Sequence, residues 1–157
     1  MQRLGTFKTT NFKDFGINYL QGVLHTFSSL NQPDSNLAYD YDIVAVNRTG
    51  SDLIDCLKQQ IPLFSDEQIV LDSITDEEFK ISLKNWLFEV KLVSDYRMER
   101  QTAHVFELIK DITEFKSIYQ LSGLDTVKFS YDFGVGYEHF VLEANEKLYL
   151  IYFSFSD

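Results

Sequence analysis

The chain has 157 residues, a formal net charge of −10 and a pI of about 4.6, with 45% hydrophobic and 15% aromatic residues. The length fits a single domain over residues 1–157, and the many large rings favour a packed core over disorder. The acidity disfavours nucleic acid as a partner, because a phosphate backbone is bound through basic side chains. The lone cysteine, the absence of a signal-peptide pattern and the lack of any run near ~18 apolar residues predict a cytoplasmic protein that binds no membrane.

The predicted elements begin with a helix over residues 12–30, where apolar side chains recur at steps of three and four. The apolar run 43–46 predicts a short strand buried on both faces. A second helix should start at Thr49 or Ser51, carry Asp52 and Asp55 in its first turns, and stop at Pro62. Residues 68–71 are a further strand fragment.

Residues 79–93 fit two periods. With period two, Phe79, Ile81 and Leu83 share a face, and a second alternating run after residues 84–85 completes a hairpin. With period 3.6 the same residues form a helical stripe, which Thr75 and Glu78 would start as a capping box. We prefer the hairpin, although its two-residue turn lacks the usual glycine.

The C-terminal part combines one helix with strands. Helical spacing extends over residues 102–121 and ends at Ser122-Gly123. Alternating patterns at 126–133, 137–143 and 148–155 predict a three-stranded antiparallel meander. The fold class is therefore α+β, with a C-terminal meander packed with two or three helices.

Negative charge is concentrated between Asn36 and Lys80, where ten carboxylates and three bases leave seven of the ten net negative charges. A localised negative field attracts basic surfaces, so the expected partner is a basic protein. Carboxylates explained as helix-start residues are set aside. The remaining candidates for partner contact are Asp40, Asp42, Asp66, Glu67, Asp72, Asp76 and Glu77.

Catalytic and metal signals are weak in comparison. His139, with Tyr137 and Asp132, is the one acid–base candidate, and Asp40 and Asp42 could share a divalent cation from one strand face. Cys56 lies among acidic residues, which should raise the pKa of its thiol and leave it inert. No motif predicts a cofactor or a bound metal.

The leading hypothesis is a non-enzymatic protein-binding module, with tyrosine and tryptophan side chains as anchors at the contact. Size, acidity and the lack of a catalytic motif are typical of immunity or antitoxin proteins that inhibit a basic bacterial toxin. One alternative is a small hydrolase or ligand-binding enzyme with a site near His139. Another is a homo-oligomer that pairs through the C-terminal strand, which is apolar on both faces.

Overall fold

The computed structural model describes residues 12–32, 37–89, 93–124 and 136–156. Five strands form one sheet in the order β1-β5-β4-β3-β2, and every neighbouring pair is antiparallel. The strands are β1 (Ala38–Asn47), β2 (Val70–Ile74), β3 (Ser117–Ser122), β4 (Gly136–Glu143) and β5 (Lys147–Ser156). The expected α+β class, with strands concentrated towards the C-terminus, is confirmed.

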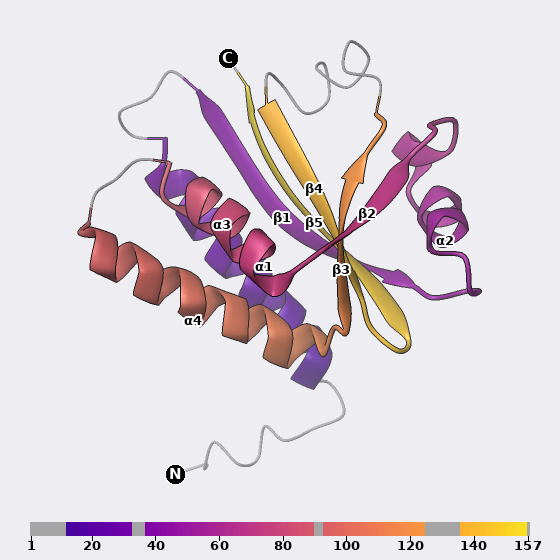
Figure 1. Ribbon diagram of the computed structural model, residues 1–157, viewed down its shortest axis with the longest axis horizontal. Coiled ribbons are helices and arrows are strands. Elements are labelled where there is room, and N and C mark those ends of the chain that lie inside the picture. The colour runs from indigo at the N-terminus through magenta and orange to yellow at the C-terminus, as the bar shows by residue number, and fades with distance from the viewer. Residues whose placement is uncertain (1–11, 33–36, 90–92, 125–135, 157) are drawn as a thin grey trace.

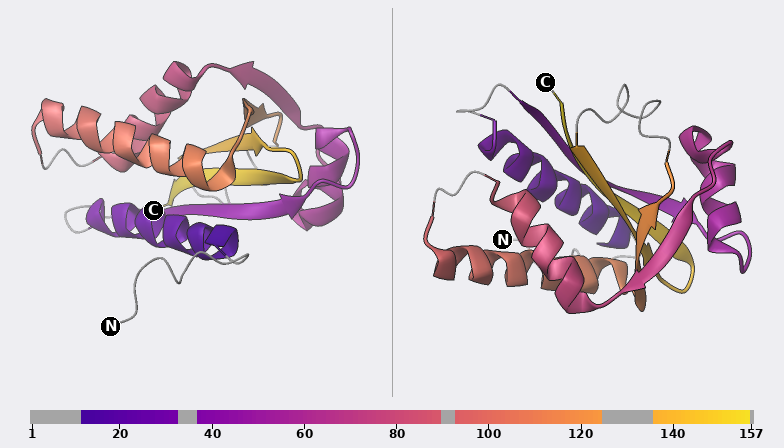
Figure 2. Two further views of the ribbon diagram at one scale, coloured as in Figure 1. Left: turned by 90° about the horizontal axis from the view of Figure 1, so that it is seen from below. Right: turned by 45° about the horizontal axis from the view of Figure 1, so that its top comes forward.

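The helices divide between the two faces of the sheet. Helices α1 (Phe12–Leu30), α3 (Asp76–Leu87) and α4 (Asp95–Thr113) gather on one side, and α2 (Leu53–Gln60) with the short 3-10 helix η2 (Pro62–Phe64) lies on the other (Figure 1). Figure 2 shows the same division from two further directions. The predicted bounds of α1 are confirmed, and α2 is capped by Asp52, whose carboxylate accepts from the amides of Ile54 and Asp55.

Each face of the sheet has its own apolar core. The larger core packs α1, α3 and α4 against residues such as Tyr41, Phe140 and Phe153. The smaller core packs α2 and η2 against Val141 and Leu150. Because strand side chains alternate between faces, β4 and β5 are apolar on both sides, as a buried interior strand requires.

The hairpin preferred for residues 79–93 is wrong, because residues 76–87 form helix α3. The Thr75 hydroxyl accepts a 3.1 Å hydrogen bond from the Glu78 amide and so provides the helix cap. Phe79, Leu83, Trp86 and Leu87 are all buried on one side of the helix. The helical period therefore describes the segment, and residues 84–85 make no turn.

The helix predicted over 102–121 is also wrong in its extent. α4 starts earlier, at Asp95, and ends at Thr113, where Glu114 takes a left-handed conformation with φ of 54°. Residues 117–122 then form β3, the first strand of the β3-β4-β5 meander. The segment predicted as that first strand, 126–133, lies outside the described residues.

β1 is longer than predicted and is an edge strand. Its burial alternates from Ala38 to Ile43, and Val46 near its end is buried in the smaller core on the opposite face. Three glutamines donate to carbonyls on its outer side: Gln32 to Tyr39, Gln21 to Ile43 and Gln60 to Asn47. The accepting residues are four apart, as expected for groups that point to one side of a strand. Side chains thus close the outer edge of β1 at regular intervals.

Candidate functional site

The seven predicted contact residues fall into two groups, because β1 and β2 are the two edges of the sheet. Asp40 and Asp42 lie on β1. The other five lie on β2 or next to its ends. Four strand spacings of about 4.8 Å separate the edges by roughly 19 Å. The seven residues therefore do not form one continuous acidic patch.

The Asp40–Asp42 pair lies on the α2 side of the sheet. Asp42 accepts a 2.8 Å hydrogen bond from the Ile43 amide, and its carboxylate is 3.4 Å from Nε2 of His25 on α1. Burial and the neighbouring Asp42 charge raise the pKa of Asp40. Burial and both carboxylates raise the pKa of Tyr152, on the adjacent strand, to about 12. This pair is thus partly satisfied within the protein.

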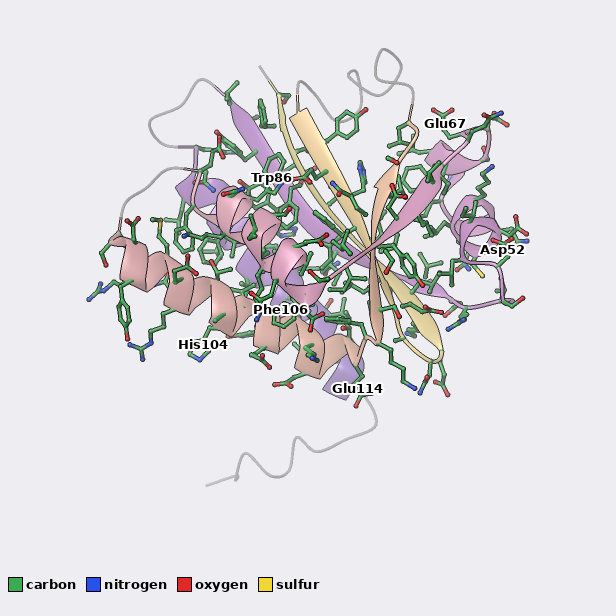
Figure 3. The ribbon with its side chains drawn as sticks, viewed as in Figure 1. Asp52, Glu67, Trp86, His104, Phe106 and Glu114 are labelled. Carbon is green, nitrogen blue, oxygen red and sulfur yellow. The ribbon has the colours of Figure 1, made fainter. Side chains whose placement is uncertain are left out.

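The second group follows β2 from one end to the other. Asp66 and Glu67 lie between η2 and β2, Asp72 is in the middle of the strand, and Asp76 and Glu77 open α3. Glu67 is half-buried and the other four are exposed. Figure 3 places Glu67 on the α2 side of the molecule. We call the five residues Asp66, Glu67, Asp72, Asp76 and Glu77 the β2 acidic group.

Two members of this group, Asp76 and Glu77, form ion pairs with lysines of the described residues. Asp76 lies 3.6 Å from Nζ of Lys110, and Glu77 lies 3.2 Å from Nζ of Lys80. Both also stand at the N-terminus of α3, where the helix dipole favours carboxylates. Asp66 and Asp72 form no ion pair with any described residue. These two exposed carboxylates are the ones most available to a partner.

His139 is buried, with 1% of its surface exposed, among the rings of Phe64, Tyr137 and Tyr152. Burial lowers its pKa to about 4, so the imidazole is neutral at neutral pH. It borders a cavity of about 440 Å³ where β3 and β4 separate, together with Tyr137 and Glu138. Asp132, the third residue of the predicted acid–base site, lies outside the described residues.

Cys56 differs from its expectation. The side chain is buried on α2, but a hydrogen bond between its thiol and the Thr49 hydroxyl lowers the pKa of the thiol. The Arg48 charge acts in the same direction, so it is not the nearby aspartates that decide this pKa.

Trp86, expected among the anchors of a protein contact, belongs to the core instead. It is 8% exposed and stacks on Phe153 at 5.6 Å. Its Nε1 donates to Glu138 at 2.7 Å, and Gln120 donates to the other oxygen of the same carboxylate at 2.8 Å. Figure 3 shows Trp86 at α3, on the side of the sheet that α1 and α4 also cover. Sequence reasoning missed this link, because residues 86, 120 and 138 meet only through the tertiary fold.

Within the described residues no three His, Cys, Asp or Glu side chains are grouped as a metal site would require. In the same part of the chain, none of the helices has the length and apolar character needed to cross a bilayer. Comparison with protein-family models, with curated proteins and with solved structures found no match.

Proposed function

We propose that this protein is a non-enzymatic binding module whose β2 acidic group engages a basic protein, in the manner of an immunity or antitoxin-type inhibitor of a toxin. The observation that carries the proposal is the charge around β2. Between Ser65 and Phe79 there are six carboxylates and no lysine or arginine. Five of the six are exposed. Such a run repels anionic ligands and attracts cationic surfaces.

The carboxylates of β2 itself and of the preceding loop carry most of the expected attraction. Asp66 and Asp72 are exposed and form no ion pair with the described residues, so a partner does not have to break an existing contact to reach them. Steering by exposed charges acts mainly on the association rate and depends on ionic strength. A toxin whose active site binds phosphates would present the complementary basic surface.

The test uses the product of a gene adjacent to this one, the arrangement typical of an immunity protein and its toxin. Calorimetric titration at low and high salt should show affinity that falls as salt rises. The double variant Asp66→Lys/Asp72→Lys should lower the affinity by about 10- to 100-fold, which corresponds to ~1.4–2.7 kcal/mol. The structural reason is that both substitutions place like charges against the basic partner.

A matched control makes the same change of charge elsewhere. Glu107 on α4 and Glu146 between β4 and β5 are exposed, and no ion pair joins either to the described residues. The variant Glu107→Lys/Glu146→Lys should bind within about threefold of the wild type. Equal losses in the two double variants would mean that only net charge matters, and an unchanged affinity in the first would remove the acidic interface.

The enzyme alternative rests on the cavity beside His139. A general base works best with a pKa near the operating pH, and this imidazole has a pKa of about 4. The oligomer alternative rests on the C-terminal strand, which pairs with β1 and with β4 inside the chain. Neither arrangement favours these alternatives over a binding module.

A further inference from the structure

The two edge strands of the sheet differ in whether their outward-pointing backbone groups are covered. The outer side of β1 is occupied by α1 and by the side chains of Gln21, Gln32 and Gln60. On β2, within the described part of the chain, the backbone of residues 70–74 bonds only to β3. The alternate amides and carbonyls that point away from β3 are therefore open to another chain.

The side chains of β2 also leave the strand accessible. Val70 is 48% exposed, Asp72 and Ser73 are exposed, and Leu71 is half-buried. Figure 2 shows β2 on the rim of the molecule, on the side away from α1. Natural proteins usually protect such an edge from pairing by making it short or by placing charge on it. β2 is short, with five residues, and carries one charge, Asp72. The charge of Asp72 therefore bears on which added strand this edge could accept.

Charge decides which kind of strand the edge would accept. Asp72 points to the same face as Ile74, which packs against the larger core, and Leu71 points to the opposite face. A strand added beside β2 would bring its own side chains within about 5 Å of these positions. A lysine or arginine facing Asp72 is favoured, whereas a second copy would set its own acidic residues against this group.

We infer that the β2 edge binds an extended, basic segment of the partner by strand addition, with lysine or arginine on the face of Asp72 and apolar residues on the face of Leu71. This inference rests on the proposed function and adds the mode of binding to it. Main-chain hydrogen bonds supply the affinity in this mode, and alternate side chains supply the specificity. Five residues at ~3.4 Å each give a contact of roughly 17 Å.

The experiment uses a synthetic peptide, Lys-Val-Lys-Val-Lys-Val, which presents lysine on one face of a strand and valine on the other. The control is the same peptide with alternate amides N-methylated. This control keeps the charge but cannot form one row of main-chain hydrogen bonds. Binding to the full chain is followed by amide chemical shifts and hydrogen exchange. The unmodified peptide should protect amides within residues 70–74 and bind at least about tenfold more tightly than the methylated one.

The variants Asp72→Lys and Glu107→Lys change the net charge of the protein equally, but only the first changes the charge of β2. The first should lose binding of the unmodified peptide, and the second should keep it. Equal binding of the two peptides, lost in Asp72→Lys, would overturn strand addition and leave the acidic binding function intact. Amide chemical-shift changes centred on residues 38–47 would also overturn the inference, and so would the absence of binding of either peptide. The proposed function is decided separately, by the titration with the neighbouring gene product. Concentration-dependent dimers with protected β2 amides would make the occupant a second copy, contrary to the inference.

Discussion

At the scale of single residues, His139 couples stability to pH. Its pKa is about 4 in the folded protein against 6.5 for an exposed histidine. Between these values the unfolded chain binds a proton that the folded chain excludes, so stability rises with pH from about 4 to 6.5. A difference of about 2.5 pKa units corresponds to ~3 kcal/mol, present in full above pH 6.5 and lost as the pH falls to 4.

The measurement is urea unfolding from pH 4 to pH 8 for the wild type and for His139→Phe. Carboxylates also titrate in this range, and the raised pKa of Asp40 acts in the opposite direction, so the difference between the two proteins is the quantity of interest. The difference in unfolding free energy between the two proteins should change with pH only between about pH 4 and 6.5. Parallel curves would mean that His139 is protonated as easily in the folded state as in the unfolded state.

At the scale of elements, the Thr75 side chain stabilises the start of α3. Removing the Thr75 hydroxyl leaves the Glu78 amide without its cap, because the two are joined by a 3.1 Å hydrogen bond. Thr75→Ala should therefore lower the free energy of unfolding by about 1 kcal/mol, whereas Thr75→Ser should stay within a few tenths. Chemical denaturation of the three proteins measures this, and equal losses for Ala and Ser would show that the threonine methyl matters instead.

Local sequence patterns predicted an element correctly where a single hydrophobic period describes the segment. They failed where the same residues fit both a helical period and a strand period. The α1 helix was predictable because its apolar stripe is uninterrupted, and Thr75 with Glu78 did signal α3. Nothing comparable marks the end of α4 at Thr113. Residues 114–116 contain neither glycine nor proline, and Ile118 and Tyr119 continue the helical spacing while they lie in a strand. Pairing of β3 with β2 and β4, a tertiary effect, decides that segment.

At the scale of the whole molecule, the strand order decides what the acidic residues can do together. The sequence identified the seven carboxylates, but no local pattern indicates that β1 and β2 lie at opposite edges. That order divides the set into a β1 pair, partly satisfied by His25 and the Ile43 amide, and the β2 acidic group. The open edge of β2 was likewise not predictable, since it depends on which strand ends the sheet.

The same strand order determines the effect of substitutions in β5. Phe153 is fully buried and packs on Tyr41 at 5.1 Å and on Trp86 at 5.6 Å. Truncating a buried phenylalanine costs ~3–5 kcal/mol, and an unpaired buried carboxylate adds a further penalty, against a total stability of about 5–15 kcal/mol. Phe153→Asp should therefore fail to fold, as measured by circular dichroism.

Size-exclusion chromatography with light scattering completes this prediction. The wild type should elute as a monomer of 18.3 kDa, because both edges of β5 are used within the chain. Ile81→Asp, at a position 63% exposed on α3, is the control and should fold and elute as the wild type does. A wild-type dimer that Phe153→Asp converts to a folded monomer would instead establish pairing through the C-terminal strand. That result would require β5 to exchange between chains, since β1 and β4 occupy its edges in the monomer.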